Sequence, residues 1–120
     1  KLDGIYIPAF NKQINFIKNL FPRNFKIIGS AHNNIEILIK KKQGCNIIFV
    51  SPIFKVKKKN YFLNVIRFNL LTLDRKIKFV ALGGINEKNK NRLKLLSICG
   101  FAGISYFQKK TAPLGGRLIY

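Results

Sequence analysis

Five short apolar runs, separated by segments with a helical period, set the pattern of this chain. The runs are rich in β-branched and aromatic residues and stop at small or polar residues, as strands buried on both faces of a sheet do. They cover residues 3–8, 25–30, 46–51, 78–82 and 101–106. Because strands and helical segments alternate, we predict parallel strands joined by crossover helices.

Four helices are expected between these runs. Residues 9–21 present a mostly one-sided apolar face, and Pro22 closes that segment. The second helix is predicted to begin at Asn33 or Asn34, which can cap it, and to stop at Gly44. Its predicted core-facing residues are Ile35, Leu38 and Ile39.

The other two helices differ in the width of their apolar faces. Residues 61–73 are broadly apolar, so we predict a helix that is buried on more than one side. Asn86 is expected to cap the fourth helix, which continues to about Ser97 and ends before Gly100.

Two architectures fit this alternation of strands and helices. One is an open, doubly wound sheet, and the other is part of a (β/α)8 barrel. In both, ligands bind at the carboxyl ends of the parallel strands. Every residue of this chain with plausible chemistry falls at such a strand end, so the active site is expected at that edge of the sheet.

The charge of the chain is strongly basic, with 23 Lys and Arg residues against 4 Asp and Glu residues and a net charge of +19. Such a charge suggests an anionic partner such as nucleic acid, acidic lipid or a phosphorylated metabolite. The lysines are spread over every segment, however, and aromatic residues do not alternate with them in a stacking pattern. We therefore favour a solvated basic surface over a nucleic-acid interface.

The two cysteines, Cys45 and Cys99, lie near the starts of apolar runs and form no CxxC pair. We expect small buried thiols in a reducing compartment, and hence a cytoplasmic location, rather than a disulfide or a metal site. No apolar run approaches the roughly 18 residues of a membrane helix, and the first residues do not resemble a signal peptide. Because the sequence contains no methionine, we expect a processed chain or a piece of a longer protein.

The turn Gly83-Gly84 is the first candidate for ligand binding. It follows a strand and precedes a capped helix, where glycines let backbone N–H groups approach a phosphate. A plain tight turn is the alternative interpretation. The lysine-rich loop and Ser105, near the end of the last strand, favour a phosphorylated ligand, since barrels often bind phosphate at the loops after their last two strands.

The loop after the third strand carries Lys55, Lys57, Lys58 and Lys59, each of which could also be an ordinary solvated lysine. His32, the only histidine, directly follows a strand end, where a proton-transfer residue could lie. A histidine that merely caps the loop is the alternative. With four carboxylates in the whole chain, a carboxylate dyad for acid–base chemistry is not expected, and Mg²⁺ would find few ligands.

Five segments, taken in order, resemble motifs of one enzyme family: DGIYIP, IIGSAH, GCNIIFVSPIFK, FVALGGI and GFAGIS. Their order and spacing are similar to those of the thiamine phosphate synthase and thiazole tautomerase (TenI-type) family, whose members are (β/α)8 barrels. The resemblance implies that residues 1–120 form a partial TIM-barrel domain with about the fourth to eighth strands. It also implies that N-terminal β/α units are absent, since a barrel needs about 200 residues or more.

The resemblance implies roles for individual residues as well. Ser30 matches the serine that contacts the pyrimidine substrate, and Lys59 matches the loop lysine that contacts its diphosphate and acts in catalysis. Gly84, with Gly83 beside it, matches the glycine whose backbone holds the thiazole phosphate. His32 stands where the tautomerase branch uses a histidine for proton transfer.

The chain also departs from the family pattern. The two loop threonines that bind thiazole phosphate are replaced by Val56 and Lys58, and the isoleucine–serine pair after the last strand is replaced by Phe107 and Gln108. The family resemblance implies Mg²⁺ as a cofactor, yet Phe10 stands at the position of its aspartate ligand. The expected metal therefore lacks an expected ligand.

The first hypothesis is an enzyme of thiamine biosynthesis that joins hydroxymethylpyrimidine diphosphate to thiazole phosphate and releases pyrophosphate. Its partners would be these phosphorylated small molecules. The alternatives within the family are a TenI-like thiazole tautomerase, with His32 as the acid–base residue, and a divergent non-catalytic member. A basic nucleic-acid-binding domain is the alternative from another class. A homo-oligomer is compatible with each hypothesis, and no membrane partner is expected.

Overall fold

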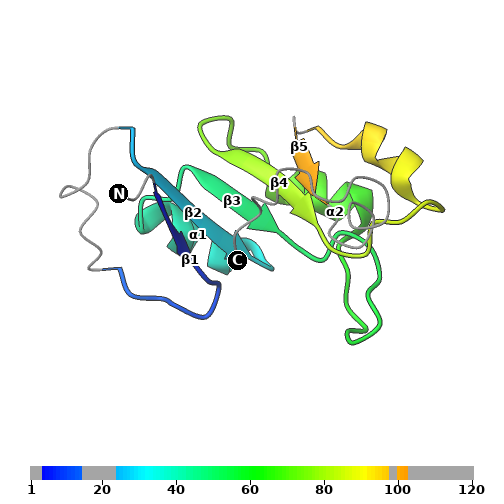
Figure 1. The fold of residues 1–120 in the computed structure, drawn as a ribbon, viewed down its shortest axis with the longest axis horizontal. Coiled ribbons are helices and arrows are strands. Elements are labelled where there is room, and N and C mark those ends of the chain that lie inside the picture. The colour runs from blue at the N-terminus through cyan, green and yellow to red at the C-terminus, as the bar shows by residue number, and fades with distance from the viewer. Residues whose placement is uncertain (1–3, 15–23, 98–99, 103–120) are drawn as a thin grey trace.

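The computed structural model describes residues 4–14, 24–97 and 100–102. In these ranges five parallel strands form one sheet, with the strands side by side in chain order (Figure 1). The predicted parallel sheet is thus confirmed. The strands are β1 (Gly4–Ile7), β2 (Lys26–Ala31), β3 (Ile47–Val50), β4 (Lys78–Leu82) and β5 (Gly100–Ala102). Residues 103–106 of the last predicted strand lie outside the described residues.

The register of the sheet aligns the carboxyl ends of its middle strands. Ala31 of β2, Val50 of β3 and Ala81 of β4 are Cα partners in one row. Because the strands are parallel, the residues that follow this row emerge at the same edge. His32 and Ser51 therefore both leave the sheet where ligands of such folds bind.

Two α-helices, α1 (Asn34–Lys42) and α2 (Asn64–Leu71), lie on one face of the sheet, behind the strands in Figure 1. The predicted start of α1 is confirmed, because Oδ1 of Asn33 accepts the N–H of Glu36 at 2.9 Å. None of the described helices has the length and apolar character needed to cross a membrane.

The fourth predicted helix is wrong in type and extent. A 3₁₀-helix, η2 (Lys90–Leu95), takes its place after β4. Oδ1 of Asn86 accepts the N–H groups of Lys88 (2.8 Å) and Asn89 (3.1 Å), so Asn86 caps a turn rather than an α-helix. Asparagine side chains compete with helical backbone bonds in this way, which explains why the α-helix does not start here.

Residues 9–14 do not form the start of the helix predicted over residues 9–21. The N–H of Asn11 donates to the carbonyl of Pro8 at 3.1 Å and closes a turn. The carbonyls of Asn11 and Gln13 accept hydrogen bonds from side chains of α1 and of its C-cap residue instead of from amides one helical turn ahead. The remainder of that prediction, residues 15–21, lies outside the described residues.

A buried lysine of α1 and the buried glutamine that follows the helix as its C-cap hold this segment. Nζ of Lys40 donates to the Asn11 carbonyl at 2.8 Å and to Oε1 of Gln43 at 2.7 Å. Nε2 of Gln43 donates to the carbonyls of Asn11 (2.8 Å) and Gln13 (2.9 Å). Burial lowers the pKa of Lys40. The network satisfies the polar atoms of both side chains, as buried polar groups require.

The core face of α1 therefore differs from the predicted one. Ile35 and Leu38 are exposed and Ile39 is only half-buried, whereas Ile37 and Lys40 are buried. At 3.6 residues per turn, the buried Ile37 and Lys40 lie about half a turn away from the face that the three predicted residues share. The prediction for these three residues is wrong because apolar periodicity cannot anticipate a buried lysine.

The helix α2 begins at Asn64 and is buried on one side only, contrary to the prediction. Phe68 is fully buried and Val65 is buried beside it. Ile66 and Leu70, in contrast, expose 77% and 65% of their surface. The helix carries apolar residues on several sides, but only the side that faces the sheet is buried.

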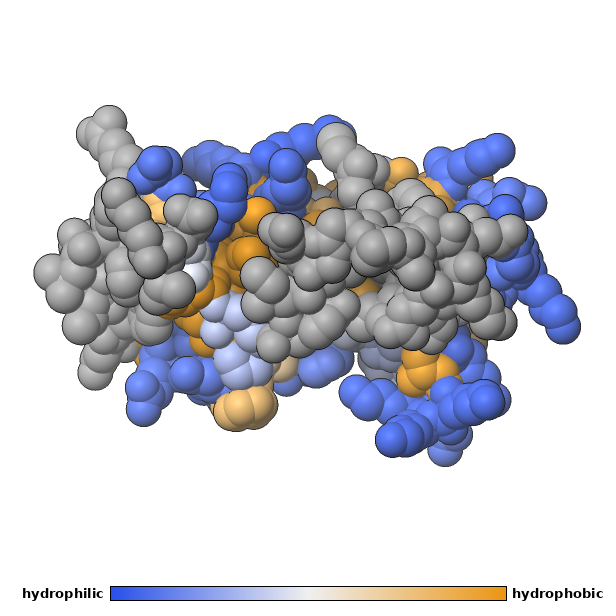
Figure 2. All heavy atoms as spheres, viewed as in Figure 1, coloured by the Kyte–Doolittle hydropathy of each residue, from blue (hydrophilic) through white to orange (hydrophobic). Residues whose placement is uncertain are grey.

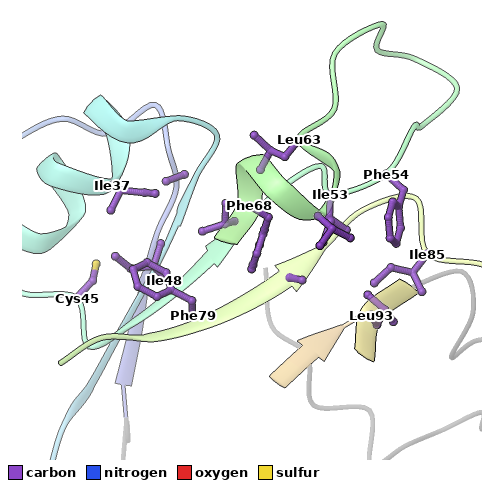
Figure 3. Packing of buried hydrophobic residues seen from close by; sticks show 14 of the residues in the cluster. Ile37, Cys45, Ile48, Ile53, Phe54, Leu63, Phe68, Phe79, Ile85 and Leu93 are labelled. Atoms are coloured by element: carbon purple, nitrogen blue, oxygen red, sulfur yellow. The ribbon is translucent and has the colours of Figure 1, made fainter. Parts of the chain in front are cut away.

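The core between the helices and the sheet is continuous from Ile37 to Leu93 (Figure 3). Cys45 lies in it, 3% exposed, which confirms the predicted buried thiol. Burial raises the pKa of Cys45 to about 11, so the thiol is protonated at neutral pH and is a poor nucleophile. Cys99 lies outside the described residues.

Candidate active site

A cleft of about 670 Å³ opens at the carboxyl ends of β3 and β4. Its walls are the lysine-rich loop after β3 and the glycine turn after β4. The structure thereby brings together three of the predicted site residues, Lys59, Gly83 and Gly84. The cleft is lined by Ser51, Pro52, Lys55, Val56, Lys57, Lys59, Leu82, Gly83, Gly84, Ile85 and Asn86.

Backbone hydrogen bonds join the base of the loop to the glycine turn. The N–H groups of Ile53 and Phe54 donate to the carbonyls of Leu82 (3.0 Å) and Gly83 (3.1 Å). Both side chains are buried in the core (Figure 3). These hydrogen bonds fix the base of the loop to the sheet, and the lysines follow directly after this fixed segment.

Beyond this base the loop turns back as a short hairpin. Val56 and Lys59 form an isolated antiparallel bridge, in which the Lys59 N–H donates to the Val56 carbonyl at 3.3 Å. Lys55, Lys57, Lys58 and Lys59 are all exposed, and none forms an ion pair with a described residue. In Figure 2 hydrophilic side chains gather around this hairpin at the lower right. The loop offers several uncompensated positive charges beside the glycine turn.

The glycine turn is shaped by close contact with that loop. The φ angles of Gly83 and Gly84 are 102° and 74°. A Cβ on Gly84 would lie 2.4 Å from the Phe54 carbonyl oxygen, and one on Gly83 would lie 2.9 Å from Cα of Pro52. These angles and contacts require glycine with or without a ligand. The tight-turn interpretation thus accounts for both glycines by itself.

Asn89 also holds the glycine turn and is a residue that the sequence analysis missed. Its Nδ2 donates to the Gly84 carbonyl at 2.8 Å, and its Oδ1 accepts the Asn86 N–H at 2.8 Å. The N–H of Gly84 has no hydrogen-bond acceptor among the described residues. It is therefore available to an anion. The spacing of Asn86 and Asn89 is the signal that could have indicated an asparagine-stabilised turn.

Replacing Gly84 with alanine is expected to lower the free energy of unfolding. A strained backbone angle alone typically costs about 1–3 kcal/mol, and the loss should exceed that amount. The added Cβ must also displace the Phe54 carbonyl. Urea unfolding of the variant checks the effect. The matched control is Gly44→Ala, because Gly44 has a φ of 94° and lies at the end of α1, away from the cleft. Equal losses in both variants would show that the contact with Phe54 relaxes freely.

Ser30 lies at the same edge of the sheet but does not line the cleft. It is half-buried on β2, in a row with Phe49 of β3. Its Oγ accepts the hydroxyl of Tyr6 at 2.7 Å. The sequence analysis missed Tyr6, although alternation along β1 and β2 could have placed both side chains on one face of the sheet.

His32 binds the first turn of α1 and likewise does not line the cleft. Its Nδ1 lies 3.0 Å from Oε1 of Glu36, and the same oxygen accepts the His32 backbone N–H at 2.7 Å. This contact agrees with the loop-capping interpretation. A carboxylate beside an imidazole is also an arrangement found in acid–base pairs, so the proton-transfer hypothesis stays open. The sequence analysis missed Glu36, four residues on.

Two further expectations concern Ser105 and Mg²⁺. Ser105 lies outside the described residues. Within the described ranges, no group of three or more His, Cys, Asp or Glu side chains could hold a metal ion. Phe10, the residue that the family resemblance matches to an aspartate ligand, is 83% exposed and offers no ligand. The described residues therefore supply no cluster of ligands for Mg²⁺.

Comparison with known proteins points to one family. The family model described as thiamine monophosphate synthase (TMP-TENI) matches residues 1–107. The thiamine-phosphate synthase of Prochlorococcus marinus is 33% identical over 99 residues, which are 80% of this chain and 28% of that protein. The thiamine-phosphate synthase of Clostridium tetani is 31% identical over 106 residues, which are 86% of this chain and 50% of that protein. The chain thus spans half or less of the length of these relatives.

A solved structure shows the same fold. Thiamine phosphate pyrophosphorylase from Pyrococcus furiosus matches with a TM-score of 0.65 and 24% identity, over 83% of this chain and 48% of that one. This likeness confirms the predicted architecture, in which the five parallel strands correspond to part of a (β/α)8 barrel.

Proposed function

The chain belongs to the thiamine monophosphate synthase (TMP-TENI) family, and we propose that the protein containing it is a thiamine phosphate synthase. The reaction joins hydroxymethylpyrimidine diphosphate to thiazole phosphate and releases pyrophosphate. The observation that carries this proposal is the cleft lined by exposed lysines and by a glycine turn in which the Gly84 N–H has no acceptor among the described residues. Two phosphorylated substrates need such a concentration of positive charge and backbone donors.

The proposed reaction has a bond-breaking step and a bond-forming step. The carbon–oxygen bond to the diphosphate breaks with both electrons on oxygen, which leaves a pyrimidine cation and pyrophosphate. The ring nitrogen of thiazole phosphate then attacks the cation and forms the new carbon–nitrogen bond. Negative charge builds up on the leaving group, so its stabilisation by fixed positive charges is the main task of the protein.

Specific residues are proposed for these tasks. Lys59 contacts the diphosphate, and it lines the cleft on the wall opposite the glycine turn. Gly84, with Gly83, holds the thiazole phosphate through the free Gly84 N–H. Ser30 contacts the pyrimidine, with Tyr6 fixing its hydroxyl at 2.7 Å. Ser105 is proposed as a further contact to substrate.

We further propose that the chain supplies about the fourth to eighth strands of the barrel as one domain. The order β1 to β5 and the match to 48% of a solved relative support this placement. The remaining β/α units would complete the substrate site. The activity is thus proposed for a full-length protein.

The test is an assay of the full-length protein with both substrates over a range of Mg²⁺ concentrations. Formation of thiamine phosphate, with equimolar pyrophosphate, is the expected result. Absence of product at every Mg²⁺ concentration would overturn the synthase proposal and leave the thiazole tautomerase or a divergent, non-catalytic member of the family. A lack of product would be consistent with the loss of the two phosphate-binding threonines of the family, which Val56 and Lys58 replace according to the family resemblance.

A thiazole tautomerase is the second candidate, because His32 and Glu36 form a pair at 3.0 Å at the carboxyl end of β2. In this function the imidazole transfers a proton during aromatisation of the thiazole, and Glu36 orients the ring. The check is a His32→Asn variant of the full-length protein, which is expected to lose aromatisation. Full retention of that activity would remove His32 from the reaction.

A further inference from the structure

Three large apolar side chains are exposed in and just after α2. Ile66, Leu70 and Leu73 expose 77%, 65% and 68% of their surface. Ile66 and Leu70 are one helical turn apart and share a face of the helix. Leu73 follows three residues later, beyond the helix end. These three residues are called the α2 stripe below, and they lie on the outside of a helix whose inner side is closed by Phe68.

The α2 stripe continues into a second cleft, at the amino-terminal edge of the sheet. This cleft has a volume of about 420 Å³ and is lined by residues 72–79 with Asn46 and Ser97, so it includes Leu73. It is called the basal cleft below. It shares no residue with the cleft at the carboxyl ends of the strands and is no part of the candidate active site.

The basal cleft carries positive charge. Arg75, Lys76 and Lys78 line it and are exposed. Its acidic residue, Asp74, is already balanced, because Nζ of Lys41 lies 2.6 Å from the Asp74 carboxylate. The hydrogen bond from Lys41 also holds the pKa of that carboxyl below its usual range. Arg75 and Lys78 form no ion pair with any described residue.

Further β/α units of the same sheet would leave the α2 stripe uncovered. The helix follows β3, the central strand of the five, and a further parallel strand would join beyond β1 or β5. On one flank α2 already meets the η2 segment. There, Nδ2 of Asn69 donates to the Leu95 carbonyl at 3.0 Å, and Oδ1 of Asn69 accepts the Ser97 N–H at 2.9 Å. Further strands that join the sheet beyond β1 or β5 therefore do not supply a partner for this surface.

We propose that the α2 stripe and the basal cleft form one docking surface for an acidic amphipathic helix of another protein. Apolar residues at helical spacing on the partner would cover Ile66, Leu70 and Leu73, as in helix-in-groove recognition. Carboxylates at its end would pair with Arg75 and Lys78. This surface is independent of the proposed synthase activity, since no residue of the α2 stripe or of the basal cleft lines the candidate active-site cleft.

Charge and shape favour this occupant over others. A second copy of the chain, at +19, would bring like charge to the basal cleft. Duplex nucleic acid presents phosphates but no apolar face to cover the stripe. A flat bilayer would cover the stripe without filling a cleft of about 420 Å³. An acidic amphipathic helix has an apolar face that can cover the stripe and carboxylates that can pair with the basic residues of the basal cleft.

The test uses the full-length protein and a fluorescent synthetic peptide of about five helical turns, with leucines on one face and glutamates beside them. We expect saturable binding by fluorescence polarisation. A peptide of the same composition in scrambled order is expected to bind at least about tenfold more weakly, since it lacks the apolar face. Leu70→Ser and Arg75→Glu are each expected to weaken binding of the designed peptide by about tenfold. Ile35→Ser, at a residue of α1 that is 68% exposed and outside the stripe, is the matched control and should change nothing.

Several results would overturn the proposal. Equal binding of the scrambled peptide, or binding that ignores Leu70→Ser, would show attraction by charge alone. No binding of the designed peptide would exclude the helix as occupant. Leu70-dependent binding to vesicles of phosphatidylserine and phosphatidylcholine or to duplex DNA, without peptide binding, would assign the surface to a membrane or to nucleic acid. Leu70-dependent self-association in sedimentation would assign it to a second copy.

Discussion

Replacing Lys59 with alanine is expected to lower the turnover of the full-length synthase by a factor on the order of 10² to 10³, the usual loss when one transition-state charge donor is removed. Lys59 lines the cleft and forms no ion pair with a described residue, so its ammonium is available to the leaving diphosphate. The measurement is steady-state turnover with both substrates saturating. The loss should appear in kcat, because charge on the leaving group grows in the transition state.

The control for Lys59→Ala must remove one positive charge without touching the cleft. Lys42→Ala does so, because Lys42 is exposed in the last turn of α1 and lines neither cleft. Turnover of this control should match the wild type. An unchanged rate in Lys59→Ala would end its proposed role, whereas equal losses in both variants would indicate that net charge, rather than position, matters.

Replacing Phe68 with alanine is expected to lower the free energy of unfolding by about 3–5 kcal/mol, the usual cost of deleting a buried aromatic side chain. Phe68 is fully buried where α2 meets the sheet (Figure 3). The cavity left behind would be enclosed by backbone hydrogen-bonded strands that cannot collapse into it. Urea denaturation followed by circular dichroism measures the loss.

Leu70→Ala is the matched control for this stability effect. It lies in the same helix, two residues on, and exposes 65% of its surface. Its expected effect on the free energy of unfolding of the isolated protein is within about 0.5 kcal/mol, as for other exposed positions. If Leu70→Ala lowered the free energy of unfolding of the full-length protein as much as Phe68→Ala does, other parts of that protein would have to cover the outer face of α2.

The strands were predictable because their signal is local. A run such as Ile47–Val50 is apolar throughout and stops at Ser51-Pro52, and the parallel direction of the strands then follows from their alternation with helical segments. The cap of α1 at Asn33 was predictable for the same reason.

The buried faces of the helices were not predictable from the sequence. Lys40 can be buried because the backbone carbonyl of Asn11 and Oε1 of Gln43 accept hydrogen bonds from its ammonium, and a helical period does not reveal these partners.

The candidate site was predictable as a set of strand ends but not as a cleft. Lys59 and Gly84 lie on different loops, and they share a cleft because Phe54 bonds to the glycine turn. Ser30 and His32 lie at the same edge and yet outside that cleft, bound to Tyr6 and Glu36. Strand-end position alone does not distinguish these two groups.

The sequence by itself determined the alternation of parallel strands and the edge at which chemistry gathers, because both follow from residues that are neighbours in the chain. Only the tertiary structure decided which strand ends share a cleft, which face of each helix is buried, and that a basic cleft lies at the opposite edge. These features depend on contacts between distant residues, such as Lys41 with Asp74 and Lys40 with Asn11. Such contacts form only when packing brings together segments that carry no common local signal.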